Sequence, residues 1–382
     1  MAAVVTKQRT VTRILLHCVP LTPLHVGDGT ELSLDEYLLE TAEEEGQSPR
    51  LCRFDPVEAM RRMTAEERTR FRTALDSGRL ADASKALRSA GKRCIVERVP
   101  VSPRSRAELE KALNDPSSLR SGGVHAFVRS GGRPYIPGSS IKGAFRTALA
   151  SARLPRDQRP HAWTHELALQ AALGLDPGDT STDPLRFLGV ADAELPAGAL
   201  MIDRAEIIKR GGSPGPSKIQ MHYERTCARS HDPADRTRFE VGLTLDSRLG
   251  LDRKRLFQLT SRFHWSIWQG ERERFFRDHP RTCDAMDRLL RAVKLPGERT
   301  AAVAGLEEAT NFVLLRLGRF GHFESKSLEH VRRGHVPQAR ERDRKIRQPG
   351  EWGSTRTVTR LHDGTPIPFG WVLGYEKDYE IL

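Results

Sequence analysis

The segment 237–246 is the feature that most narrows the possible folds of this chain. Its apolar residues alternate with small or polar ones, and a period of two predicts a β-strand with one buried face. The apolar positions are Phe239, Val241, Leu243 and Leu245. A sheet of such strands must cover its apolar face with a second layer, which the helix-like segments of the chain can supply. We therefore predict an α+β protein.

Other segments carry the signals of strands and helices. Residues 11–19 are apolar and β-branched and stop before Pro20, which predicts a buried strand. Strand pairs are predicted between 186–194 and 199–209 and between 218–228 and 237–246, with closing strands at 355–361 and 367–375. Helices are predicted within 56–115, where Asp55 would be the N-cap and Pro56 the first helical residue, and at 139–152, 161–174, 252–277 and 300–317.

The length of 382 residues suits two folding units better than one. The order of strands and helices suggests two α+β units, each an antiparallel sheet backed by helices. We place the boundary near residue 212, with a helical insertion at about 41–130 in the first unit.

The net charge indicates the kind of partner that the chain binds, and the cysteines indicate its redox compartment. The net charge of +12 and the pI near 9.8 favour a polyanion, of which nucleic acid is the usual one. The five cysteines are scattered and form no CxxC pair, so we expect reduced thiols in a cytoplasmic protein and no zinc site. No apolar stretch approaches the roughly 20 residues of a membrane span, and no membrane partner is expected.

The segment 137–146 (PGSSIKGAFR) combines a strand end with a helix start. Ser139 or Ser140 is expected to cap the helix. The free N–H groups and the positive dipole end of such a helix form an anion site. Lys142 and Arg146 are four residues apart, so both should project from one helix face.

The remaining residues of that helix fit the same interpretation. Ile141, Phe145 and Leu149 form an apolar stripe for the core. Gly143 leaves room for a phosphodiester chain, and because it follows Lys142, where a Walker P-loop needs Ser or Thr, such a loop is excluded. The alternative is an ordinary capped helix with solvated basic residues.

Three further segments could contact nucleic acid. In 318–327 (GRFGHFESKS), two glycines bracket exposed N–H groups, and Phe320 or Phe323 could stack on a base; a helix end followed by a turn is the alternative. The stretch 24–29 (LHVGDG) carries a weak GxG signal that a β-turn also explains. Residues 332–347 hold seven basic and two acidic residues, which predicts either a loop that tracks phosphates or a solvated surface loop.

No catalytic or metal site can be assembled from the sequence. His161 and His165 are four residues apart, but the zincin order is absent and no third ligand is evident. Asp183 and Asp192 could hold a divalent ion, yet no matched acid–base pair accompanies them. We predict no catalytic residue, no metal and no cofactor.

These segments, in this order, resemble the RAMP superfamily of CRISPR proteins. The resemblance is strongest to the RAMP subunit that caps the backbone filament of Csm-type (type III-A) effector complexes. It rests on five segments: 21–40 (LTPLHVGDGTELSLDEYLLE), 135–150 (YIPGSSIKGAFRTALA), 183–195 (DPLRFLGVADAEL), 318–327 and 366–375 (PIPFGWVLGY). In the third, Ala191-Asp192-Ala193 replaces the family's Val-Ser-Asp-Ser-like sequence, and 318–327 has fewer glycines than the family's loop.

The resemblance implies a fold and a role. The fold is α+β with two ferredoxin-like (RRM-like) domains: 1–212, which includes the helical insertion, and 213–382, which includes the Gly-rich loop. The role is a non-catalytic subunit that binds the guide RNA (crRNA) near its 3′ end and supports its maturation in antiviral defence. Implied partners are crRNA, target RNA in the assembled complex, other RAMP subunits, especially the repeating backbone subunit, and a recruited trimming nuclease.

The resemblance also transfers RNA-binding roles to matching positions. These are His25, Gly27, Ser139, Ser140, Lys142, Arg146, Gly318, Arg319, Gly321 and Lys326. The Asp that cuts target RNA in repeating backbone subunits has no clear counterpart, since Asp28 and Asp35 lie in different contexts. Two alternatives stay open: a metal- or His-dependent RAMP endoribonuclease, and a single-strand-binding module unrelated to CRISPR.

Overall fold

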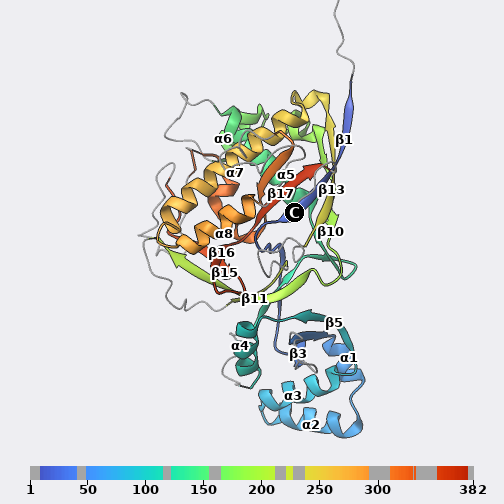
Figure 1. Cartoon of the computed structure of the whole chain (residues 1–382). Helices are drawn as coiled ribbons and strands as arrows, with labels where there is room; N and C mark the ends of the chain where they lie inside the picture. Colours follow the sequence, from blue (N-terminus) through green and yellow to red (C-terminus); the bar gives the residue numbers. More distant parts are fainter. Residues whose placement is uncertain are drawn as a thin grey trace, which may run out of the picture.

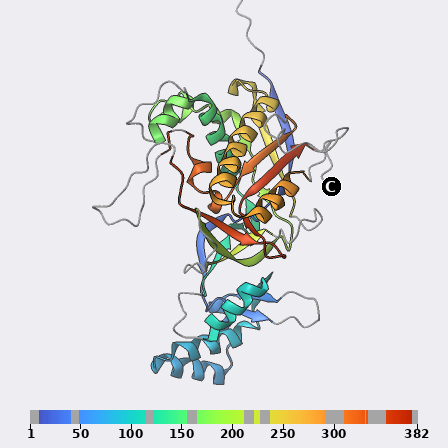
Figure 2. The same ribbon diagram turned by 60° about the vertical axis from the view of Figure 1, so that its left-hand side comes forward.

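The computed structural model describes residues 9–40, 49–114, 122–154, 165–210, 221–226, 237–291, 310–329, 331–332 and 351–376. These residues form a larger body and a smaller lobe, which extends from one end of the body (Figures 1 and 2). Within the described residues, no helix is long and apolar enough to cross a membrane.

A five-stranded sheet forms one half of the body. Its order is β14 (Phe312–Arg316), β17 (Trp371–Glu376), β1 (Val11–Pro20), β13 (Phe239–Asp246) and β9 (Leu188–Val190), and every neighbouring pair is antiparallel. In β13 the side chains of Phe239, Val241, Leu243 and Leu245 are buried while the residues between them are exposed. This confirms the predicted one-sided strand.

Two helices cover one face of this sheet, as Figure 1 shows. Helix α5 (Gly138–Arg153) contacts β9, and α7 (Arg253–Phe275) contacts β14 and α5. Ile141, Phe145 and Leu149 of α5 are fully buried, as predicted. Shorter helices surround this layer: α6 (His165–Leu173), α8 (Pro280–Arg291) and the 3₁₀ turns Thr180–Thr182, Pro184–Phe187 and Ser247–Leu249.

A six-stranded sheet lies between this layer and the lobe. Its order is β16 (Pro366–Pro368), β15 (Thr355–Arg360), β11 (Leu200–Lys209), β12 (Met221–Thr226), β6 (Val124–Phe127) and β2 (Gly27–Leu32). Beside it lies a small sheet of β10 (Ala193–Glu194), β8 (Arg133–Ile136) and β7 (Arg129–Ser130).

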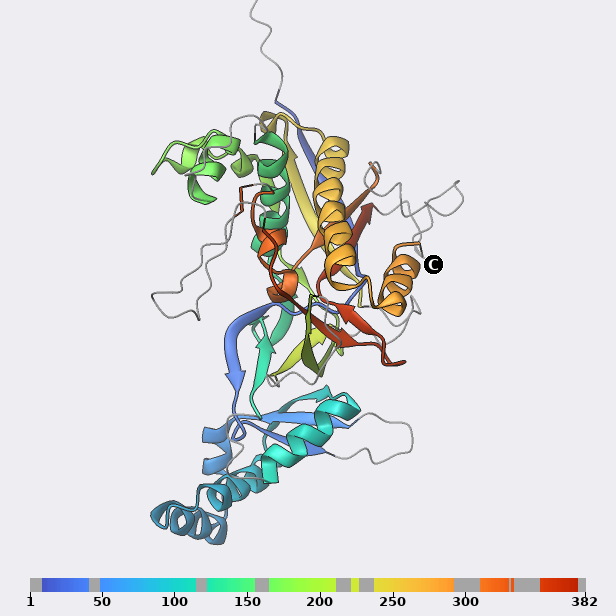
Figure 3. The same cartoon turned by 90° about the vertical axis from the view of Figure 1, so that its left-hand side faces the viewer.

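The smaller lobe is an insertion between β2 and β6 (Figure 3). It contains a sheet of β3 (Tyr37–Glu40), β4 (Arg50–Phe54) and β5 (Ile95–Pro100), with helices α1 (Pro56–Arg61), α2 (Ala65–Asp76), α3 (Leu80–Gly91) and α4 (Pro103–Asn114). Asp55 caps α1 and Pro56 begins it, as predicted. The prediction of helix throughout 56–115 is wrong at β5, so the insertion is mixed rather than helical.

Several predicted strand partners are also wrong. β11 pairs with β12 and β15, β13 pairs with β1 and β9, and residues 312–316, predicted as helix, form β14. All five side chains of β14 are buried, and an apolar run of that kind fits a buried helix as well as a buried strand. Each large sheet takes strands from both sides of residue 212, so a boundary there does not separate the sheets.

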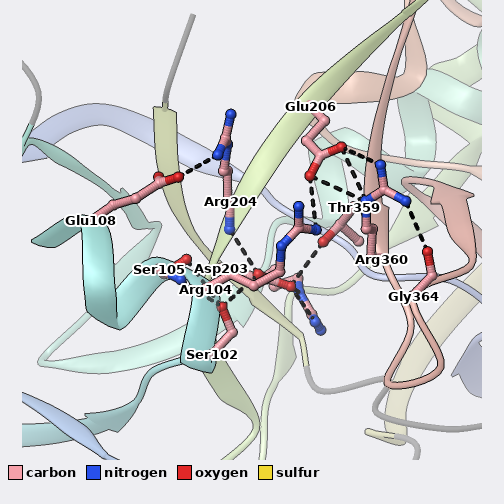
Figure 4. Close-up of polar contacts among 11 residues, drawn as sticks. Ser102, Arg104, Ser105, Glu108, Asp203, Arg204, Glu206, Thr359, Arg360 and Gly364 are labelled. Carbon is pink, nitrogen blue, oxygen red and sulfur yellow. Dashed lines mark hydrogen bonds and ion pairs between the residues drawn. The ribbon is translucent and has the colours of Figure 1, made fainter. Parts of the chain in front are cut away.

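A buried carboxylate joins the lobe to the body (Figure 4). Asp203 on β11 accepts hydrogen bonds from the hydroxyls of Ser102 and Thr359, each at 2.8 Å, and from the guanidinium of Arg225 at 2.6 and 2.9 Å. Burial raises the pKa of Asp203, but these donors outweigh it and hold the pKa below its ordinary value. Three strands and the start of α4 thus meet at one charge.

We expect Asp203→Ala to lower the free energy of unfolding by about 3–5 kcal/mol, because it leaves the buried Arg225 guanidinium without its counter-charge. Urea denaturation of both proteins measures this difference. Glu66→Ala is the control, since Glu66 makes only an exposed surface pair with Arg70 and its loss should cost less than about 0.5 kcal/mol. Equal losses in the two variants would contradict a structural role for Asp203.

Candidate nucleic-acid interface

Strand direction brings two distant loops to the same end of the five-stranded sheet. β1 and β14 both pair antiparallel with β17, so they run the same way and their following loops emerge together. Backbone hydrogen bonds connect these loops. The N–H of Arg319 donates to the carbonyl of His25 at 2.9 Å, and the N–H of Gly370 donates to the carbonyl of Pro23 at 2.7 Å.

The contact between these loops requires glycine at position 318. Gly318 has φ of 82°, in the region that side chains disfavour, and a Cβ there would lie 2.3 Å from the carbonyl oxygen of His25. The 3₁₀ turns Arg319–Gly321 and Phe323–Lys326 follow directly. The close approach at Gly318 therefore fixes the position of the segment that carries Arg319 and Lys326.

The start of helix α5 differs from the prediction. The N-cap is Pro137, and neither Ser139 nor Ser140 makes a capping hydrogen bond. Instead, the Asp192 carboxylate accepts from the N–H of Gly138 at 2.6 Å. Asp192 follows β9 in the chain, so sequence spacing could not show that it meets a helix 54 residues earlier; its role is to satisfy a free N–H group.

The two loops and the first turns of α5 line one open cleft of about 650 Å³. Seven of the ten predicted RNA-binding residues line it: Gly27, Ser139, Ser140, Arg146, Gly318, Arg319 and Lys326. Arg316, Thr147 and Ser325 line it as well, although sequence analysis did not select them. Gly143 is also part of the wall, and a Cβ there would meet no atom within 4 Å, so this wall has free space in front of it.

The cleft carries positive charge that the protein does not neutralise. Within the described residues, neither Arg319 nor Lys326 makes an ion pair with a carboxylate. The pKa of Lys326 is lowered, mainly because its ammonium is partly buried. The nearby guanidiniums of Arg316 and Arg319 lower this pKa further. Such crowding of cations costs free energy and is relieved when an anion binds.

Arg146 is less available than its neighbours in the cleft. Its guanidinium contacts the Asp183 carboxylate at 2.5 Å, and both side chains are partly exposed. An anion would have to compete with Asp183 for this arginine. Lys142, four residues earlier, is not among the residues that line the cleft.

His25 and Gly321 lie behind the cleft rather than in its wall. His25 is buried, and its Nδ1–H donates to the carbonyl of Glu224 at 2.7 Å. Burial lowers the pKa of His25 to about 4, so the ring is neutral near pH 7. The carbonyl of Gly321 accepts from the Ser325 hydroxyl at 2.6 Å. Both residues support the loops.

The predicted base-stacking role of Phe320 is not supported by its surroundings. Its ring packs against Tyr223 and Phe369, with ring centroids 4.7 Å apart in both pairs. The neighbouring rings of His25 and Tyr223 extend this aromatic cluster. Phe320 therefore anchors its loop to the six-stranded sheet.

A buried charge network lies beneath the glycine-rich loop. The Glu271 carboxylate contacts Arg316 at 2.6 Å and Arg356 at 2.8 Å, and Arg356 also contacts Glu324 at 3.0 Å. All four side chains are fully buried. Because they come from α7, β14, β15 and the loop, their pairing could not be read from sequence spacing. The network holds Arg316 at the floor of the cleft.

The aspartates considered as metal ligands or catalytic groups make structural contacts. Within the described residues, no group of three or more His, Cys, Asp or Glu side chains could hold a metal ion. Asp183 and Asp192 make the structural contacts given above, and Asp28 accepts from the N–H of Thr30. His161 and the side chain of His165 lie outside the described residues, as does the basic stretch 332–347 apart from the buried Arg332.

Comparison of the sequence with known proteins gives a match to one family and to one curated relative. The model of the RAMP superfamily matches residues 17–258. A curated relative, the CRISPR system Cms protein Csm5 of Enterococcus italicus, is 40% identical over 74 residues, which span 19% of this chain and 18% of the relative.

A solved structure shows a similar fold. A chain in a cryo-EM structure of a Csm–crRNA–target RNA ternary complex of a type III-A CRISPR-Cas system aligns with a TM-score of 0.57 at 18% identity, covering 95% of this chain and 100% of that chain. The crystal structure of T. onnurineus Csm5 aligns with a TM-score of 0.48 at 18% identity, covering 93% and 99%.

The close approach at Gly318 can be tested against a glycine without neighbours. Gly364 has the same positive φ of 81°, but a Cβ there would meet nothing within 4 Å. Ala at either position should cost about 1–3 kcal/mol of folding free energy for the sparsely populated backbone conformation. Gly318→Ala should cost an additional ~1–3 kcal/mol, because its Cβ overlaps the His25 carbonyl. Chemical denaturation measures both; equal costs would show that the loops are not in tight contact.

Proposed function

Because this chain belongs to the RAMP superfamily, we propose that it is a non-catalytic guide-RNA-binding subunit of a type III-A CRISPR effector complex. In this role it caps the backbone filament near the 3′ end of the crRNA and supports crRNA maturation. The short segment shared with a Csm5 protein and the fold shared with a chain of a Csm–crRNA–target RNA complex support this assignment.

The observation that carries the proposal is the composition of the cleft. Among the described residues, its wall combines two cations without carboxylate partners, Arg319 and Lys326, with hydroxyl groups and glycines, and no aromatic side chain lines it. Such a surface suits phosphate and sugar groups, which position a nucleic acid without reading its sequence. A guide whose sequence varies requires contacts of this kind.

The proposal names the partners of the chain. They are the crRNA, target RNA in the assembled complex and neighbouring RAMP subunits, above all the repeating backbone subunit. A trimming nuclease that shortens the crRNA is a further partner. Assembly of this kind belongs to the cytoplasm, and it assigns no reaction step to the chain.

We also propose that the five-stranded sheet is one of the family's ferredoxin-like units. Along the chain, β1, α5, β9, β13, α7 and β17 follow the order β-α-β-β-α-β, and both helices lie on one face. The elements of this unit come from both sides of residue 212, because the lobe and the six-stranded sheet are inserted between them.

The cleft is tested most simply by removing its unpaired charges. We expect Arg319→Ala combined with Lys326→Ala to weaken crRNA binding at least tenfold, since a charge-assisted hydrogen bond contributes about 1.5–3 kcal/mol. The dependence of log affinity on log salt should fall by about 1.4, at roughly 0.7 per lost phosphate contact. Filter binding over a salt series measures both quantities.

The matched control removes the same charge elsewhere. Arg68 and Arg72 are exposed, lie one turn apart on α2 and make no ion pair within the described residues, so Arg68→Ala with Arg72→Ala should leave affinity and salt dependence unchanged. Wild-type affinity in a folded Arg319/Lys326 variant would remove the cleft as the RNA site. Thermal melting verifies that each variant folds.

A further inference from the structure

The part of the inserted lobe between β4 and α4 is rich in basic side chains. Residues 49–114 hold 16 Lys and Arg against 9 Asp and Glu, a net charge of +7 out of +12. None of the residues that line the cleft belongs to this lobe, which lies apart from the α5 and α7 layer (Figure 3). The basic side chains of 49–114 therefore lie outside the cleft.

Part of this charge faces a groove in the lobe. The groove has a volume of about 660 Å³ and lies between α3 and α4, with Leu38 and Leu39 of β3 among its lining residues. Lys85 of α3 and Lys92, the C-cap residue directly after α3, line it. They are seven residues apart, which places both on one helix face with about 10 Å between them along the axis, at 1.5 Å per residue.

The acidic residues of the groove already have partners. Asp82 pairs with Arg79 at 3.3 Å, and Glu110 pairs with Arg106 at 2.6 Å; neither arginine lines the groove. Lys85 and Lys92 are exposed, and neither makes an ion pair or a side-chain hydrogen bond within the described part of the chain. Two ammonium groups thus remain free to bind an anion.

Arg88 shapes the groove instead of serving as a third free charge. Its guanidinium donates to the carbonyls of Leu34 at 3.4 Å and Leu113 at 3.2 Å. These bonds tie α3 to the end of α4 and to the segment before β3. The two lysines are therefore presented from a helix whose position is fixed.

We propose that this groove is a second RNA-backbone site, separate from the cleft. Lys, Asp, Glu, Ser and Ala, which form most of its lining, are depleted in the cores of protein–protein interfaces. Its lining contains no aromatic side chain that could stack on a base, so contact would be to phosphates and independent of sequence. Lys is a point charge well suited to such a contact. The site goes beyond the proposed function, because it does not require that the cleft bind RNA.

The test uses the full chain with a fluorescently labelled single-stranded oligo-uridylate as the probe. Lys85→Ala with Lys92→Ala should lower the slope of log affinity against log salt by about 1.4, which amounts to about tenfold at roughly 0.15 M salt. The control, Arg68→Ala with Arg72→Ala, removes two charges from the neighbouring helix α2 and should change neither quantity. A Lys85→Gln/Lys92→Gln variant repeats the measurement with polar replacements, and thermal melting shows that each protein folds.

The outcomes separate this proposal from the proposed function. A loss in the Lys85/Lys92 variants while the Arg319/Lys326 variant binds as the wild type would support the groove and contradict the cleft. The reverse pattern would overturn the groove and leave the cleft. If the α2 control lost as much RNA affinity as the Lys85/Lys92 variants, the groove proposal would also be overturned, because the loss would reflect total charge and not a site. If polyglutamate displaced the probe from the cleft-deficient variant as well as unlabelled oligo-uridylate did, the groove would be a site for acidic polypeptides instead.

Discussion

The hydrogen bond from the Arg319 N–H to the His25 carbonyl is the interaction on which the candidate site depends. It forms because β17 lies between β1 and β14 and forces both to end on the same side. Gly318 makes it sterically possible, and Gly370 allows a similar approach on the other side, where a Cβ would lie 2.2 Å from the carbonyl oxygen of Leu317. Without this contact, the residues after β1 and β14 would have no common wall.

The distribution of charge pairs separates structural residues from functional ones. Deep in the body, Asp203 pairs with Arg225, and Glu271 pairs with Arg316 and Arg356. Without these carboxylates, burying the arginines would cost about 3–5 kcal/mol of folding free energy for each broken pair. At the cleft, Arg319 and Lys326 have no such partners within the described residues. A protein tolerates crowded cations when a ligand supplies the counter-charge, and phosphate is the ligand that this wall of cations, hydroxyls and glycines fits.

Sequence analysis succeeded where local chemistry decides the structure. The period of two at β13, the Asp55–Pro56 helix start and the apolar stripe of α5 were all predicted, because each depends on residues within one element. Seven of the ten residues proposed from short motifs with glycine and basic side chains line the cleft. Strand partners were not predicted correctly, because pairing depends on the whole sheet and not on one element. The Arg146–Asp183 pair and the Asp192 contact were not predicted either, because they join residues 37 and 54 positions apart. The exposed lysines of α3 lie in no motif, and only the fold shows that they share a groove.

The central claim is that two loops and the first turns of α5 form one RNA-binding wall. Ultraviolet cross-linking of crRNA to the wild-type chain, followed by mass spectrometry of the linked peptides, tests it directly. The account predicts cross-links in the peptides that contain Gly27, Ser139–Thr147 and Gly318–Lys326, which supply most of the residues that line the cleft. Cross-links confined to the opposite side of the five-stranded sheet, around the exposed Val11 and Leu15 of β1, would contradict it.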